Sequence, residues 1–118
     1  MELVAFLGSD KENWGQISAL IKRGQWEKVI LVQNREAESF PHAGNSEIVK
    51  IDSEQPILQM KEELLEKLKK KLAGGFEVSL SLASGNGKEH MALIGALLGI
   101  PVGIRIVVFT KNGVENLT

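Results

Sequence analysis

Short apolar runs alternate with amphipathic stretches along this chain, and the alternation predicts where strands and helices lie. Mostly apolar runs predict strands at 3–7, 29–32, 76–82 and 102–109, and an alternating run predicts another at 47–51, near an edge of the sheet. Runs that are apolar on both sides are typical of strands buried on both faces of a parallel sheet.

The stretches between these strands carry apolar residues at helical spacing. In the first stretch, Ser9 and Glu12 form a capping-box pattern ahead of an apolar stripe that ends at Gly24. The second helix is expected to begin with Ser53 as its N-cap and to stop at Gly74-Gly75.

A third helix is predicted over about 89–98, and it has two kinds of face. One face carries the larger apolar side chains, which are Met91, Ile94, Leu97 and Leu98. The other is thin enough to pack closely against the sheet or a second subunit, and it carries Ala92, Gly95, Ala96 and Gly99. After 109, a turn at 111–113 leaves a short tail.

Strands that alternate with helices predict one three-layer, Rossmann-like α/β domain over 1–118, with five mostly parallel strands in the order 3-2-1-4-5. In this order the winding reverses between the first and fourth strands, and open α/β sheets bind ligands at the carboxyl ends of such strands. Those ends carry Gly8-Ser9-Asp10 and Ala83-Ser84-Gly85-Asn86-Gly87-Lys88, which we expect to face each other across one crevice.

The second of these turns has the chemistry of an anion site. A glycine-rich turn between a strand and a helix aims backbone N–H groups at an anion, and Lys88 adds a positive charge. The helix dipole disfavours a cation at a helix start, so Lys88 favours an anionic partner. Ser9, Ser84 and Asn86 offer hydrogen bonds to phosphate, ribose or base, whereas an Asp10 carboxylate would repel phosphate.

Several familiar sites are excluded by spacing. A Walker A loop needs glycine where Leu82 stands and Ser or Thr where Glu89 stands, and Gly8 lacks the glycine partners of a dinucleotide fingerprint. Ser84 lacks the preceding glycine of a nucleophile elbow. The two histidines, His42 and His90, lie apart, so neither a metal nor a cofactor is expected.

Composition narrows the partners further. The chain has 118 residues, which suits one domain, and its 14 basic and 15 acidic residues give a net charge of −1. This balance argues against duplex nucleic acid as a partner. There is no cysteine, so thiolate chemistry is excluded. No apolar run reaches the roughly 18 residues that span a bilayer, and no signal-peptide pattern opens the chain, so we expect a cytoplasmic protein.

The two turns resemble those of the CRISPR-associated Rossmann-like (CARF) domains. In that family one strand ends in a small polar residue, and a later apolar strand leads into a Ser/Thr-Gly-Gly-Thr-Lys turn and a small-residue helix. Gly8-Ser9-Asp10 is similar to the first feature, and Ser84-Gly85-Asn86-Gly87-Lys88, followed by 91–98, is similar to the second. Asn86-Gly87 departs from the usual Gly-Thr, and Met91 comes one residue later than usual.

The resemblance implies recognition of a cyclic oligoadenylate, a second messenger of antiviral defence, by a homodimer with a two-fold symmetric pocket. It implies ligand contacts from the backbone of Gly85 to Lys88 and from the Lys88 ammonium. Some relatives also cleave the ring without metal. In that reaction Lys88 would stabilise the developing phosphorane charge and Ser9 would position the ribose.

Two other functions remain open on the residues alone. The turns also suit a binding module for a mononucleotide or a sugar phosphate, and the thin third helix suits a structural dimerisation domain without a ligand. Arg105, inside the last apolar run, is compatible with a dimer interface, an exposed edge or the pocket.

Overall fold

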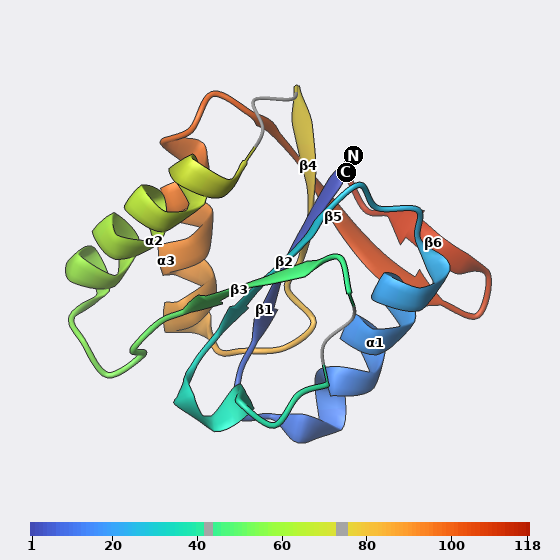
Figure 1. Cartoon of the computed structure of the whole chain (residues 1–118), viewed down its shortest axis with the longest axis horizontal. Coiled ribbons are helices and arrows are strands. Elements are labelled where there is room, and N and C mark those ends of the chain that lie inside the picture. The colour runs from blue at the N-terminus through green and yellow to red at the C-terminus, as the bar shows by residue number, and fades with distance from the viewer. Residues whose placement is uncertain (42–43, 73–75) are drawn as a thin grey trace.

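The computed structural model describes residues 1–41, 44–72 and 76–118, and these residues form a six-stranded sheet with helices on both faces (Figure 1). The strand order is β3-β2-β1-β4-β5-β6, in which β1 to β5 pair in parallel and β6 pairs antiparallel with β5. The bounds are β1 Glu2–Leu7, β2 Val29–Gln33, β3 Ser46–Lys50, β4 Glu77–Ser81, β5 Gly103–Thr110 and β6 Gly113–Asn116. The predicted order 3-2-1-4-5 is confirmed.

The helices make the two outer layers. α1 covers one face of the sheet, and α2 and α3 lie side by side on the other (Figure 1). The bounds of these three helices are α1 Trp14–Arg23, α2 Ile57–Lys71 and α3 Gly87–Leu98. Two short 3₁₀ helices, η1 Lys11–Asn13 and η2 Arg35–Ala37, follow β1 and β2.

The core explains why β1 lies in the middle of the sheet. β1 is buried along its whole length, and its side chains from 3 to 7 are apolar on both faces of the pleat. Val4 and Phe6 pack toward α2 and α3, while Leu3, Ala5 and Leu7 pack toward α1. The alternate side chains of β1 therefore join two separate hydrophobic cores.

The end of the chain differs from the prediction. The turn at Lys111-Asn112 is present, but the expected tail after it forms β6, whose residues pair with β5 from Thr110↔Gly113 to Val107↔Asn116. Gly113 has φ +106, a backbone conformation that favours glycine. The strand escaped prediction because it has only 4 residues and a single large apolar side chain, Val114.

Both predicted N-caps are wrong. Ser9 caps no helix, because η1 follows Asp10 and α1 begins only at Trp14. α2 begins at Ile57 without a side-chain cap, and Ser53 lies in the loop before it. Tertiary contacts use these segments differently: Asp10, next to Ser9, accepts hydrogen bonds from the turn after β4, and the Ser53 hydroxyl donates to Glu89. The predicted stop at Gly74-Gly75 lies outside the described residues.

The predicted thin face of α3 packs inward, and the larger apolar side chains of this helix are divided between the core and the surface. Met91 and Leu98 are 62% and 72% exposed, whereas the buried side chains of this helix are Glu89, Ala92, Leu93, Ala96 and Leu97. The small residues therefore face inward, and a Cβ added at Gly95 or Gly99 would lie 3.2–3.3 Å from side chains of α2 or from α3 backbone. Close packing of α3 against α2 requires this thin surface.

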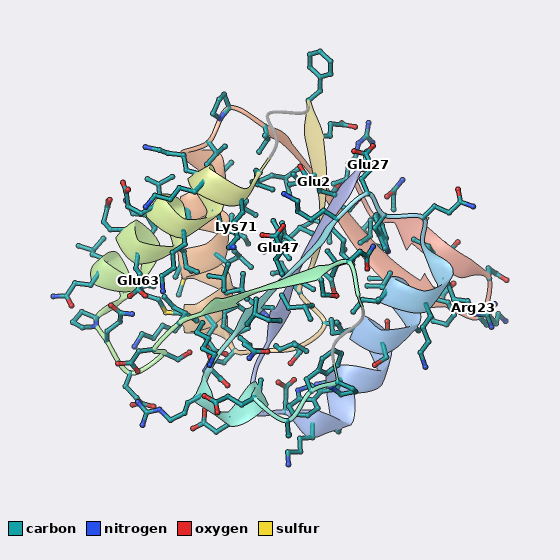
Figure 2. The ribbon with its side chains drawn as sticks, viewed as in Figure 1. Glu2, Arg23, Glu27, Glu47, Glu63 and Lys71 are labelled. Atoms are coloured by element: carbon teal, nitrogen blue, oxygen red, sulfur yellow. The ribbon has the colours of Figure 1, made fainter. Side chains whose placement is uncertain are left out.

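Charged side chains pair at the edge of the sheet where the strands begin. Figure 2 shows Glu47 of β3 beside Lys71 of α2, and the carboxylate lies 3.0 Å from that ammonium and 3.3 Å from the ammonium of Lys28. Hydrogen bonds from Lys71 and then Lys28 lower the pKa of Glu47. These ion pairs join α2 to the sheet at the end opposite to the predicted site.

Arg105 is exposed and pairs within the chain. Its Nε donates to Glu77 Oε2 at 2.9 Å, and a second guanidinium nitrogen donates to the carbonyl of Thr118 at 3.0 Å. The side chain therefore lies at the surface on β5, which is not the edge strand because β6 pairs with it, and a role in a dimer interface stays a prediction. In the described part of the chain, no helix combines the length and apolar character needed to cross a membrane.

Candidate functional site

The turns after β1 and β4 touch each other directly, at the end of the sheet away from the two chain termini (Figure 1). The buried Ser84 hydroxyl accepts a hydrogen bond from Gly8 N at 2.8 Å and donates to Asp10 Oδ1 at 2.7 Å. Gly85 N donates to the same carboxylate oxygen at 2.9 Å. The turns are neighbours, as predicted, but the crevice expected between them is closed by these contacts.

Two glycines of the site are needed by the fold itself. A Cβ on Gly8 would lie 2.7 Å from the Cα of Gly85, so the two backbones could not approach as they do. Gly85 has φ +105, and a Cβ there would lie 2.9 Å from both Phe6 and His90. Both positions are therefore explained without a ligand.

Asp10 acts as the acceptor that holds the two turns together. Burial by itself raises the pKa of this carboxyl, but hydrogen bonds from Asn13, Ser84 and Gly85 N together lower it further, so the pKa lies below its usual value. The carboxylate therefore keeps its negative charge while one of its oxygens is used within the joined turns, and its repulsion of phosphate stays a prediction.

Glu89 is a second anchor, which the sequence did not identify as part of the site. It is 2% exposed, and its Oε1 accepts from Asn86 N at 2.9 Å, while Asn86 Oδ1 accepts from Glu89 N at 2.9 Å. Its Oε2 accepts from Asn34 Nδ2 at 2.9 Å and from the Ser53 hydroxyl. The reciprocal pair is a capping box, and the Asn86-x-x-Glu89 spacing was the signal that could have found it.

The Asn86 side chain is thus used as the N-cap of α3. This contact lies within the chain, like those of Ser84 and Asp10. All three side chains therefore have a structural role in holding the turns in place. Ligand contacts by the three side chains remain predictions.

Lys88 reaches from the first turn of α3 to the loop after β3. Its Nζ donates to the carbonyl of Ser53 at 2.8 Å, and the side chain is half-buried. An ammonium group has three hydrogens, so two remain for another partner. Lys88 therefore both fixes the 52–56 loop and keeps a positive charge at the mouth of the site.

Gly87 differs from the other glycines of the turn. It is exposed, it has no positive φ, and a Cβ added to it would meet nothing within 4 Å. As the first residues of α3, Gly87 and Lys88 carry N–H groups without partners inside the helix. The backbone at Gly87 is therefore open to close approach from outside.

Ser9 is the remaining predicted residue. Its side chain is exposed, and its hydroxyl makes no hydrogen bond to any residue in 1–41, 44–72 or 76–118. The predicted residues thus divide into a frame and an open surface. The frame consists of Gly8, Asp10, Ser84, Gly85 and Asn86, and the surface of Ser9, Gly87 and Lys88.

Two adjoining hollows lie at the ends of β2 and β3, beside this surface. One has a volume of about 200 Å³ and is lined by 33–35, Glu38 and 50–52. The other has a volume of about 150 Å³ and is lined by 34–36 and 52–54. The second hollow includes Ser53, which Lys88 contacts, so the open space lies one strand away from the predicted crevice.

The site offers no group of metal ligands. Among the described residues, no three of His, Cys, Asp and Glu lie close enough together to hold a metal ion. His90 is committed elsewhere, because its Nε2 lies 2.7 Å from the carbonyl of Ser84, and His42 falls outside the described residues.

Comparison with known proteins adds information on the fold. No family model and no curated protein matches the sequence. Among solved structures, Enterococcus italicus Csm6 bound to cyclic hexa-2'-fluoro-hexa-dAMP matches with a TM-score of 0.63 and 16% identity. The match covers 97% of this chain and 34% of the Csm6 chain, so this chain spans about a third of that protein's length. The resemblance drawn from the two turns is confirmed at the level of the fold.

Proposed function

We propose that this chain binds a cyclic oligoadenylate at the carboxyl ends of the strands, with a phosphate group at the N-terminus of α3. The observation that carries the proposal is Gly87, a glycine that neither backbone conformation nor packing requires. A glycine that its own chain does not require leaves the backbone open to close approach by a ligand, and Gly87 does so at the start of a helix, where N–H groups are free.

The groups around Gly87 suit a phosphate. The N–H groups of Gly87 and Lys88 lie at the positive end of the helix dipole, and the Lys88 ammonium has hydrogens left for a charge-assisted contact. Ser9 adds an exposed hydroxyl near the same turn for ribose or phosphate. The frame of Asp10, Ser84 and Gly85 holds these groups in place before any ligand binds.

The fold likeness supports the class of ligand. The Csm6 structure of the same fold is described as bound to a cyclic hexanucleotide of modified adenylates, and this chain corresponds to about a third of it. The ligand proposed for this chain is of the same class, a ring of adenylates.

A ring with two-fold symmetry suits two copies of this chain. Met91 and Leu98 leave apolar surface on the outer face of α3, where a second copy would bury it. We therefore propose a homodimer, and sedimentation of the free protein tests it: the mass of one chain at micromolar concentration would contradict it.

Gly87→Ala tests the proposed site, because it separates binding from folding. We expect the variant to fold with unchanged or slightly higher stability, since alanine is favoured over glycine in helices by about 0.5–1 kcal/mol. The added methyl group would occupy the phosphate position and weaken binding at least about tenfold, a loss comparable to one charge-assisted hydrogen bond. Calorimetry with cyclic tetra-adenylate and hexa-adenylate measures both wild type and variant.

Gly15→Ala is the matched control, because Gly15 is also an exposed helical glycine with nothing within 4 Å of an added Cβ. It should leave affinity unchanged. Equal affinities of Gly87→Ala and wild type would contradict the proposed site, and tighter binding of AMP or ATP than of the rings would indicate another phosphorylated ligand. Linear products from the ring in EDTA would reveal metal-independent cleavage.

A further inference from the structure

Gln33 is a buried amide with an unused acceptor in the wall of the larger hollow. It is the last residue of β2 and is 2% exposed, and its Oε1 has no hydrogen-bond partner among the described residues. Buried polar atoms are nearly always paired, because an unpaired one has lost its water without replacement. Gln33 also lines the hollow, so a turn of its side chain would bring this unpaired acceptor to a donor that comes from outside the chain.

The charges around the hollow indicate a neutral group. Arg35 and Lys50 are balanced by Glu38 and Asp52 in the same lining, so the hollow has no net charge to attract a phosphate. Its volume of about 200 Å³ is below the roughly 300–1,000 Å³ of pockets that hold whole ligands. It suits one flat, uncharged part of a larger molecule.

The hollow is linked to the proposed phosphate site through shared residues. The larger and smaller hollows share Asn34, Arg35 and Asp52, and the smaller one reaches Ser53. The carbonyl of Ser53 accepts from the Lys88 ammonium at 2.8 Å. These shared residues give the direction in which a nucleotide with its phosphate at the start of α3 would extend its base, toward Gln33.

We infer that Gln33 recognises the adenine base of the bound ligand, with its amide oxygen accepting from the N6 amino group and its amide nitrogen donating to N7. A glutamine amide is complementary to this edge of adenine, because it presents one acceptor and one donor side by side. The assignment rests on the proposed function and gives it base specificity. Hypoxanthine has an oxygen, O6, in place of the amino group, so this acceptor would face the amide oxygen of Gln33, which is also an acceptor.

Gln33→Met tests this assignment by replacing the amide with an apolar chain of similar length. Since the amide oxygen has no partner in the protein, the variant should be as stable as wild type. Wild type should bind the adenine ring at least about tenfold more tightly than the same ring with hypoxanthine bases, and Gln33→Met should lose this preference. Gln59→Met, on the exposed side of α2, is the matched control and should keep it.

A second measurement separates the two proposals. In the NMR spectrum of wild type, AMP should shift the side-chain amide signals of Gln33 and IMP should not. Ring binding with a preference that survives in Gln33→Met overturns the base assignment and leaves the proposed function standing. If no ring binds but AMP shifts the Gln33 signals and IMP does not, the proposal of a cyclic ligand is overturned and the base site is supported. Neither ring binding nor shifts overturns both.

Discussion

The Ser84 hydroxyl joins two turns that are 76 residues apart in the sequence. It accepts from Gly8 N and donates to Asp10, so Ser84→Ala leaves a buried N–H without its acceptor. We expect a loss of about 1–3 kcal/mol in the free energy of unfolding, measured by urea titration.

Ser9→Ala is the control for this change at the residue scale. A helix N-cap would cost about 1 kcal/mol when replaced by alanine, whereas an exposed hydroxyl without partners should cost less than about 0.5 kcal/mol. Because Ser9 caps no helix here, the smaller cost is expected. Similar losses for Ser9→Ala and Ser84→Ala would contradict the structure of the joined turns.

At the scale of elements, α3 is fixed at its N-terminus by one carboxylate. Glu89 accepts hydrogen bonds from Asn86 N, Asn34 and Ser53, which belong to three different segments of the chain. The same helix start presents the open N–H groups at Gly87. Glu89 therefore fixes the start of α3, which carries the proposed phosphate site at Gly87 and Lys88.

Glu89→Gln should destabilise the protein by about 2 kcal/mol or more, because one carboxylate oxygen becomes a donor that faces other donors. Urea unfolding measures the loss. Glu66→Gln, exposed on α2, provides the comparison and should change stability by less than about 0.5 kcal/mol. If both variants unfold at the same urea concentration, Glu89 does not hold the segments together.

At the scale of the whole molecule, stability should depend on pH through three carboxylates whose pKa values are lowered by hydrogen bonds. These are Asp10, Glu47 and Glu63. A lowered pKa in the folded state means that the stabilisation is complete above the unfolded pKa and is lost as the pH falls through the folded one. The free energy of unfolding should therefore be level near neutral pH and fall below about pH 4.

The salt concentration distinguishes how much each carboxylate contributes to the loss of stability at low pH. Glu47 and Glu63 pair with lysines at the surface, so high salt should weaken their share, while the hydrogen bonds of Asp10 inside the joined turns should persist. In high salt, Asp10→Asn should therefore reduce the remaining loss of unfolding free energy at low pH. A stability that stays constant down to pH 3 would contradict the assignment.

The sequence by itself determined the strands β1 to β5, the three α-helices and the order of these strands, but not β6. The apolar runs of β1 and β2, the helical stripe of α2 and the alternation of strands and helices are local patterns, and simple rules for parallel sheets convert them into the order 3-2-1-4-5. The same rules placed the turns after β1 and β4 together, because neighbouring parallel strands end at the same edge of the sheet.

Only the tertiary structure decided how the side chains at that edge are used. Asp10 meets Ser84, Glu89 meets Asn34 and Ser53, and Gln33 lies without a partner, because such contacts join residues that are far apart in the sequence. These contacts leave no periodic pattern in the sequence from which they could be predicted. The orientation of α3 was decided in the same way, since its small residues and its large ones both form stripes at helical spacing and only packing against α2 selects between them.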